Sequence, residues 1–236
     1  MWQIHHFPET DSTNRLALSG APGDVFTADH QSAGRGRLDH KWLSPPGENL
    51  MMSAVVDVAG AEPAEVATFP LVVGLAVADA LSTQVAEIRI KWPNDIIHAP
   101  PGQGFRKISG ILCERHGDRV VAGIGVNVNQ TAFPPEIAPR ATSLRLIGCE
   151  TSVTAVRDAI LDSLSRFVGV WRRDGFAALL PQISRLDALK GRFISVRRTD
   201  DDLVGANGIC GGIANDGSLI VGTERIYAGE AHILKI

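Results

Sequence analysis

The chain is poor in cysteine and has no apolar run long enough to cross a membrane. Its three cysteines, Cys113, Cys149 and Cys210, show no C-x-x-C spacing, so we expect reduced thiols rather than a disulfide framework. The most apolar stretch, Phe69 to Leu81, is far shorter than the roughly 20 residues that a bilayer requires. The first residues also lack the basic and apolar regions of a signal peptide. We therefore expect a cytoplasmic protein with no membrane association.

An excess of charge of either sign is also missing. The formal net charge of the 236 residues is -3, which argues against a general nucleic-acid-binding surface. Hydrophobic residues make up 44% and charged residues 21%, ordinary values for a globular protein with its own core. No internal repeat or low-complexity tract occurs. This length suits one large domain, with or without a smaller second one.

Short apolar or alternating segments in the first part of the chain predict a β-sheet. Ile88, Ile90 and Trp92 alternate with polar residues, so one face of that strand should be buried. A turn at Gly117 should join the last two strands. The predicted strands are Val25–Ala28, Leu50–Val58, Ile88–Trp92, Ile108–Glu114 and Val120–Val128.

Four segments are predicted to be helical. Pro63–Ser82 is apolar on most sides and should lie against the sheet, with Pro70 as a kink or a break. Val153–Asp174 carries one apolar stripe at helical spacing and should end at Gly175. A further helix is expected near residues 176–189. A short one is expected at residues 15–19, capped by the polar run at residues 10–14.

The residue pattern of the sequence changes after Leu189. Short β-rich runs at residues 192–198, 205–214 and 218–222 alternate with polar turns, and Asn215-Asp216-Gly217 is a strong hairpin signal. We predict a small all-β module that packs on its neighbour, because so short a chain has little core of its own. The predicted domains are residues 1–187 and 188–236.

The run Gly34-Arg35-Gly36-Arg37 indicates a loop for an anionic ligand. The glycines let the backbone approach a ligand, and the arginines supply forked donors suited to phosphate oxygens. A solvated basic turn is the alternative. The chain contains no P-loop pattern, and this run lacks the third glycine of a dinucleotide fingerprint.

Two strand ends carry polar groups that could face a ligand. Lys91-Trp92-Pro93-Asn94-Asp95 places an amide and a carboxylate after a proline, with Asp95 near a magnesium ion in the functional interpretation and an ordinary turn in the alternative. Lys107 begins the strand Ile108–Glu114, where its ammonium could enter a pocket or face solvent. Gly110 would leave room for a ligand on the sheet.

Two further runs have both a structural and a functional interpretation. Gly123 and Gly125 alternate in a strand and clear one of its faces, with Asn127 able to donate and accept; a tightly packed sheet crossing is the alternative. The run Thr10–Asn14 could hold a small polar ligand head at a helix start, although capping alone explains it.

Taken in order, these motifs resemble those of the biotin protein ligases. KWPND followed by K-x-x-G-I-L is specific to that family, and the resemblance covers nearly the whole chain. We expect the monofunctional form of this family, without an N-terminal DNA-binding domain. The matching positions are Thr10–Asn14, Gln31, Gly36, Arg37, Lys41, Trp42, Ser44, Pro45, Gly47, Asn49, Leu50, Lys91–Asp95, Lys107–Leu112 and Gly125–Asn127.

The resemblance implies an α+β fold. A mixed sheet backed by helices, like that of class II aminoacyl-tRNA synthetases, is followed by a small SH3-like β-barrel. It implies that ATP and Mg²⁺ activate biotin to biotinyl-5'-AMP, and that biotin then passes to a lysine of a carrier domain. The carrier would be the biotin carboxyl carrier domain of a carboxylase. A homodimer is compatible with the resemblance.

The resemblance also assigns roles to residues. Lys107 would meet the biotin carboxylate and the reacting phosphate, and Arg37 would act with it in catalysis. Asp95 would be the metal ligand. The biotin site would comprise Ser12, Thr13, Asn14, Gln31, Arg35, Gly36, Arg37, Lys107 and Gly110. The ATP site would comprise Trp42, Asn94, Asp95 and Asn127.

The chain departs from the family pattern at three places, one of which is the segment Ala99–Arg106, a longer connection than usual. Leu38-Asp39-His40 replaces a Gly- and Arg-containing stretch, and a carboxylate there would oppose phosphate binding. The chain begins directly at the catalytic part, so we expect no helix-turn-helix domain and no DNA binding.

Two alternatives remain open. A lipoate or octanoate ligase or transferase shares this fold, and some of these enzymes use a cysteine or lysine nucleophile; the strand pattern makes Cys113 an ordinary buried thiol. A non-catalytic biotin-binding module would bind biotin without turnover.

Overall fold

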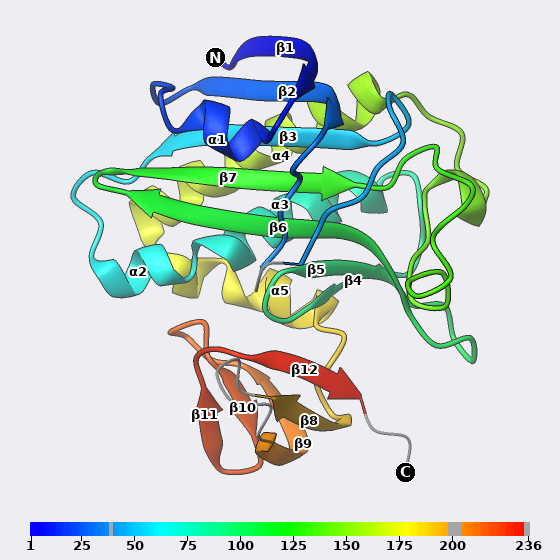
Figure 1. Cartoon of the computed structure of the whole chain (residues 1–236). Helices are drawn as coiled ribbons and strands as arrows, with labels where there is room; N and C mark the ends of the chain where they lie inside the picture. Colours follow the sequence, from blue (N-terminus) through cyan, green and yellow to red (C-terminus); the bar gives the residue numbers. More distant parts are fainter. Residues whose placement is uncertain (38–39, 198–203, 234–236) are drawn as a thin grey trace.

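Two β-sheets dominate the computed structural model, which describes residues 1–37, 40–197 and 204–233 (Figure 1). In the seven-stranded sheet the order is β1-β2-β3-β7-β6-β5-β4. Only β1 and β2 pair in parallel; every other pair in this sheet is antiparallel. Its strands are β1 (Gln3–Thr10), β2 (Asp24–Gln31), β3 (Leu50–Asp57), β4 (Ile88–Lys91), β5 (Asp95–His98), β6 (Arg106–His116) and β7 (Arg119–Val126).

Helices cover the two faces of this sheet unequally. The long helices α3 and α4 lie behind the sheet in Figure 1, whereas α1 lies in front of β2 and β3. Phe69 of α3 packs edge-on against Trp171 of α4, with ring centroids 5.1 Å apart. The helices are α1 (Thr13–Ala17), α2 (Pro63–Ala67), α3 (Phe69–Ser82), α4 (Val153–Asp174) and α5 (Leu180–Leu186), with 3-10 turns at Arg145–Ile147 and Phe176–Ala178.

Alternation along β3 and β7 divides the core in two. Met52 of β3 and Ile124 of β7 belong to the large core beneath α3 and α4. Val55 and Val121 point the other way and pack with Ala17 of α1. Since successive strand residues face opposite sides, Gly123 and Gly125 lie on the same face of β7 as Val121, the α1 side.

The predicted helix 63–82 is two helices. The break falls at Thr68, whose hydroxyl donates to the Glu65 carbonyl at 2.6 Å, and not at Pro70. Pro70 occupies the first turn of α3, where a missing N–H costs nothing. The prediction of a break was right, and its position was wrong.

The last part of the chain forms a five-stranded antiparallel sheet in the order β11-β10-β9-β8-β12. The predicted hairpin turn is confirmed, because Ala214 N donates to Ser218 O at 2.8 Å and Gly217 has φ 79°. This sheet is the small SH3-like module that was expected. Its strands are β8 (Phe193–Arg197), β9 (Val204–Ile213), β10 (Leu219–Val221), β11 (Glu224–Ile226) and β12 (Glu230–Ile233).

Hydrogen bonds join the two sheets. The indole of Trp92, after β4, donates to the Gly217 carbonyl at 3.0 Å. Ala188 N donates to the Ile90 carbonyl at 2.9 Å. Ile88, Ile90 and Trp92 are all buried, as the alternation of that strand predicts. Within the described ranges, no helix is both long and apolar enough to cross a membrane.

Candidate active site

A cavity opens on the α1 side of the large sheet, with about 890 Å³ of empty space including its mouth. Its walls come from α1, the segment before β3, the β4–β5 turn, β6, β7 and β12. The structure brings together every predicted site residue except Asn127. Those in the lining are Ser12, Thr13, Asn14, Gln31, Arg35, Gly36, Arg37, Trp42, Asn94, Asp95, Lys107 and Gly110.

Asn127 lies outside this lining. It is buried, its backbone N–H donates to the Ile108 carbonyl at 2.8 Å, and its amide donates to the Thr142 carbonyl at 2.9 Å. In this arrangement Asn127 fastens the segment after β7 to β6. Its predicted contact with ATP stays a prediction.

Glycines form the floor of the cavity. A Cβ atom at Gly123 would lie 2.1 Å from Asn14 Oδ1, and one at Gly125 would lie 2.5 Å from the Trp42 ring. One at Gly110 would lie 3.0 Å from the Lys107 ammonium and 3.1 Å from the same ring. The predicted clearing of one strand face is therefore confirmed, and side chains of the protein itself occupy much of the cleared space.

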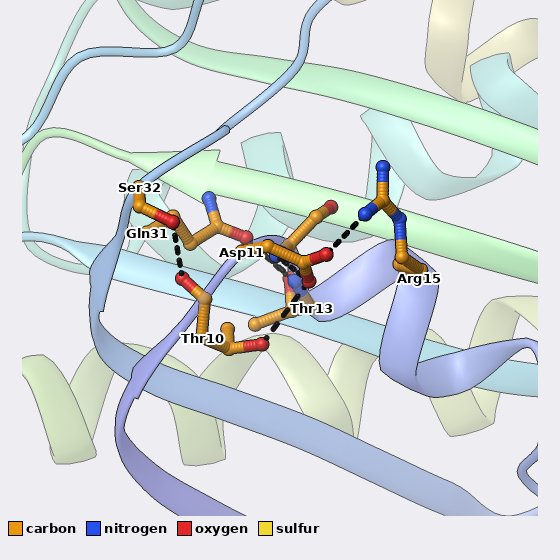
Figure 2. A network of polar contacts seen from close by, with 7 residues as sticks. Thr10, Asp11, Thr13, Arg15, Gln31 and Ser32 are labelled. Atoms are coloured by element: carbon orange, nitrogen blue, oxygen red, sulfur yellow. Dashed lines mark hydrogen bonds and ion pairs between the residues drawn. The ribbon is translucent and has the colours of Figure 1, made fainter.

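Residues at the ends of β1 and β2 hold the start of α1 in place. Asp11 Oδ1 accepts from Ser12 N at 2.6 Å, and Asp11 forms an ion pair with Arg15 (Figure 2). Ser32 N donates to the Thr10 carbonyl at 2.9 Å, as the parallel pairing of β1 with β2 requires. The helix begins at Thr13 rather than at Arg15, and the Ser12 side chain makes no capping bond. The expected helix at residues 15–19 was placed too late, and its side-chain cap is absent.

Thr13 and Asn14 belong to a hydrogen-bonded network with fewer hydroxyl hydrogens than contacts that need one. Gln31 Oε1 accepts from Thr13 N at 2.7 Å and from Thr13 Oγ1 at 3.0 Å (Figure 2). Ser53 Oγ lies 2.6 Å from Asn14 Oδ1 and 2.8 Å from Thr13 Oγ1. Amide oxygens only accept, so two hydroxyl hydrogens must serve three contacts. A ligand N–H donating to Gln31 would release the Thr13 hydroxyl for Ser53.

The other end of the cavity is cationic. Lys107 Nζ lies 2.6 Å from Asp95 Oδ1, and Lys91 Nζ lies 4.0 Å from Asp95 Oδ2. Lys91 is only 8% exposed, and burial lowers its pKa against the opposing effect of Asp95 and Glu230. Together with Arg37, the two ammonium groups outnumber the lining carboxylates of Asp95 and Glu230, which leaves a net positive charge that suits an anionic ligand.

Arg37 reaches the same end of the cavity. Its Nη1 donates to Asn94 Oδ1 at 3.4 Å, and the Asn94 amide in turn donates to the Ile111 carbonyl at 2.8 Å. Burial lowers the pKa of Arg37, while the charges of Asp95 and Glu230 raise it. An arginine stays protonated under such shifts. Arg37 is therefore a fixed positive charge in the same cavity, within reach of the charges of Asp95 and Glu230.

The segment that carries Arg35 and Arg37 folds back on itself. Gly36 N donates to the His40 carbonyl at 2.6 Å, and Trp42 N donates to the Gly34 carbonyl at 3.0 Å. His40 lines the cavity. The other two residues of the Leu38-Asp39-His40 departure lie outside the described residues.

Lys91 and Glu230 are lining residues that the sequence did not assign to the site. Lys91 is part of the KWPND run but alternates with buried residues as a solvent-facing lysine would. Glu230 arrives on β12 from the C-terminal sheet, and no motif around it signals a ligand. Its place in the cavity depends on how the two sheets pack.

The cavity provides carboxylates but no preformed metal cage. Among the residues that the structure describes, no three His, Cys, Asp or Glu side chains could hold a metal together. The Asp95 carboxylate already pairs with Lys107, and Glu230 is the other lining carboxylate. One or two carboxylates suit Mg²⁺ that arrives with substrate phosphates and keeps its waters.

Comparison with known proteins gives consistent results. The model of the biotin/lipoate A/B protein ligase family matches residues 7–130. The chain is 32% identical over 241 residues to a biotin–[acetyl-CoA-carboxylase] ligase of Paracoccus denitrificans, covering 94% of this chain and 96% of that protein. It is 29% identical over 230 residues to the bifunctional ligase/repressor BirA of Escherichia coli, covering 93% of this chain and 69% of that protein.

A solved structure agrees with these relatives. The biotin protein ligase from Aquifex aeolicus in complex with biotin and ATP superposes with a TM-score of 0.83 at 29% identity. The superposition covers 99% of each chain, so both sheets take part in it.

Proposed function

Because the chain belongs to the biotin/lipoate A/B protein ligase family, we propose that it activates biotin with ATP and transfers it to a carrier protein. The intermediate is biotinyl-5'-AMP, and the acceptor is one lysine of a biotin carboxyl carrier domain. The relatives named above are biotin ligases, and the superposed structure holds biotin and ATP.

The observation that carries this proposal is the chemical difference between the two ends of the cavity. One end offers the acceptor Gln31 and the hydrogen-poor Thr13–Ser53–Asn14 network. The other end offers the cations Lys91, Lys107 and Arg37. Biotin has N–H donors on its ureido ring and a carboxylate at the end of its chain, so its two ends match the two ends of the cavity.

In the first step, a biotin carboxylate oxygen attacks the α-phosphorus of ATP. The bond from that phosphorus to the bridging oxygen breaks, and pyrophosphate leaves with the electron pair. Lys107 exchanges Asp95 for the reacting carboxylate and phosphate, and Arg37 adds a second charge as negative charge develops. Mg²⁺ that enters with ATP would neutralise phosphate charge, with Asp95 and Glu230 as the lining carboxylates able to hold it.

In the second step, the neutral ε-amine of the carrier lysine attacks the acyl carbon. The bond from this carbon to the phosphate oxygen breaks and AMP leaves, so the lysine gains an amide. The mixed anhydride would hydrolyse in water. We propose that the cavity retains this intermediate and keeps water from it. The residues assigned to this role are Ser12, Thr13, Asn14, Gln31, Gly110 and the run Arg35–Gly36–Arg37. Trp42, Asn94 and Asn127 are proposed to contact ATP.

A thiol-based transfer of lipoate or octanoate has less support. Burial, together with the Glu114 carboxylate, raises the pKa of the Cys113 thiol, which opposes formation of the nucleophilic thiolate. Cys113 lines a different hollow, beside Trp92 and Tyr227.

We further propose a domain boundary between residues 187 and 188 and a cytoplasmic location. The boundary follows the end of α5 at Leu186 and precedes β8 at Phe193. The location fits a reaction that consumes ATP, and the three cysteines are free thiols.

Biotin-dependent exchange of labelled pyrophosphate into ATP tests the first step. We expect exchange with biotin and none with lipoate or octanoate, and Cys113→Ser should exchange at the wild-type rate. Exchange that depends on lipoate, or that is abolished by Cys113→Ser, would refute the proposed function.

A further inference from the structure

We propose that Glu114 is a positioning residue that holds Arg35 over the cavity and links it to Asn14 on the cavity floor. This inference rests on the proposed function for its ligand. Glu114 is not one of the lining residues and belongs to none of the motifs discussed above.

The Glu114 carboxylate has two partners from different segments. Its Oε2 accepts from Asn14 Nδ2 at 2.6 Å, and its Oε1 accepts from Arg35 Nη2 at 3.2 Å. In the β6–β7 ladder Glu114 lies opposite Val121, two residues along from the pair of Leu112 with Gly123. The strand alternation therefore directs Glu114 to the same face as the glycine floor.

The contact with Glu114 is one of several that hold the buried Asn14 side chain in place. Asn14 is 5% exposed, its amide nitrogen also donates to the Leu112 carbonyl at 3.3 Å, and its oxygen accepts from Ser53. The carboxylate of Glu114 thus fixes which way the amide faces, since only the nitrogen can donate to it. Asn14 Oδ1 then faces Ser53, the residue that connects it to Thr13 and Gln31.

Arg35 depends on Glu114 in a different way. Among the described residues, Glu114 is the partner of its guanidinium. The side chains of Arg35 and Glu114 are 46% and 28% exposed, and such a pair adds little to stability because solvent screens it. Its effect is therefore on where Arg35 lies, which affects how long a ligand stays beneath it.

Replacement of the carboxylate by an amide isolates this role. In Glu114→Gln the shape is kept, but the charge that holds Arg35 is lost. We expect about 10-fold faster biotin dissociation, corresponding to about 1.4 kcal/mol, with an unchanged melting temperature. The matched control is Asp79→Asn, which removes a carboxylate bonded to Ser163 at 2.8 Å and to Arg166 at 2.5 Å, far along the chain on α3. It should leave biotin dissociation unchanged.

A double-mutant cycle with Arg35→Gln separates positioning from a purely structural effect. If Glu114 acts through Arg35, the double variant should release biotin no faster than Arg35→Gln alone. Additive effects, or wild-type dissociation in Glu114→Gln, would overturn the proposal.

Limited trypsin digestion of the ligand-free protein tests the same contact without biotin. Cleavage after Arg35 or Arg37, located by mass spectrometry, should be faster in Glu114→Gln than in wild type or Asp79→Asn. Faster cleavage in a protein that does not bind biotin would support the contact and refute the proposed function. Equal cleavage rates would refute the role of Glu114.

Discussion

The Lys107 ammonium has two alternative anionic partners, the Asp95 carboxylate and an anionic ligand. Without ligand it pairs with Asp95, and it also lies 5.9 Å from the centre of the Trp42 ring. Lys91 lies on the other side of Asp95. The Asp95 carboxylate therefore still has one cationic partner after it releases Lys107. Transfer of Lys107 to a ligand therefore costs less than if Asp95 had no other partner.

Lys107→Ala should impair adenylate formation most. We expect a loss of about 100-fold or more in pyrophosphate release, because the charge that faces the developing negative charge is removed. Transfer from supplied biotinyl-5'-AMP to a carrier should fall much less. Single-turnover rates of the two steps provide the measurement, and a normal rate of adenylate formation would show that the assigned role is wrong.

Gly123 is required to be glycine by its contact with Asn14. In Gly123→Ala the new Cβ would lie 2.1 Å from Asn14 Oδ1, so Asn14 must leave its bonds to Ser53 and Glu114. We expect destabilisation of about 2 kcal/mol from overpacking and broken buried bonds, and at least a 10-fold weaker affinity for biotin.

Gly169→Ala is the matched control for this change. Gly169 lies inside α4, and a Cβ there meets nothing within 4 Å. Alanine should stabilise the helix by about 0.5–1 kcal/mol without altering biotin affinity. Denaturant titration and calorimetry measure both quantities; equal behaviour of the two variants would contradict the close packing over Gly123.

At the scale of elements, the sequence predicted the strongly patterned segments and missed the weak ones. The helix Val153–Asp174 was predicted to the residue, because one apolar stripe and Gly175 define it. β1 was missed because it is an edge strand, paired only with β2 and largely exposed. β5 was missed because it follows Pro93 and Asn94, which are ordinary turn residues.

The turn between β9 and β10 is an element whose stability depends on one carboxylate. Asp216 accepts from Ser218 Oγ at 2.5 Å, Ser218 N at 3.0 Å and Arg225 at 2.8 Å. The hydrogen bond from Ser218 is the main cause that lowers the pKa of Asp216 to about 2. A carboxylate with a lowered pKa stabilises the fold above its unfolded pKa, and this contribution is lost as pH falls through the folded value.

Asp216→Asn should therefore lower stability by about 1 kcal/mol at neutral pH. The difference from wild type should stay constant down to about pH 4 and shrink between that pH and about pH 2. Urea unfolding across this pH range measures it. A difference that grows on acidification would contradict the assigned pKa direction.

At the scale of the whole molecule, the cavity depends on both sheets. Local motifs predicted the residues of the large sheet that line it, such as Asn94 and Lys107. They could not predict Glu230, because β12 reaches the cavity only once the C-terminal sheet has packed on the Trp92 region. Contacts between distant segments, such as Glu114 with Arg35, were likewise beyond local patterns.

Biotin transfer to a carrier is the central claim, and mass spectrometry of the carrier tests it most directly. The purified protein would be mixed with biotin, Mg-ATP and an authenticated biotin carboxyl carrier domain, and AMP and pyrophosphate would be detected in parallel. We predict a carrier heavier by one biotinyl group at a single lysine, only when ATP is present. Biotin binding without pyrophosphate release, or a carrier of unchanged mass, would contradict the proposed function.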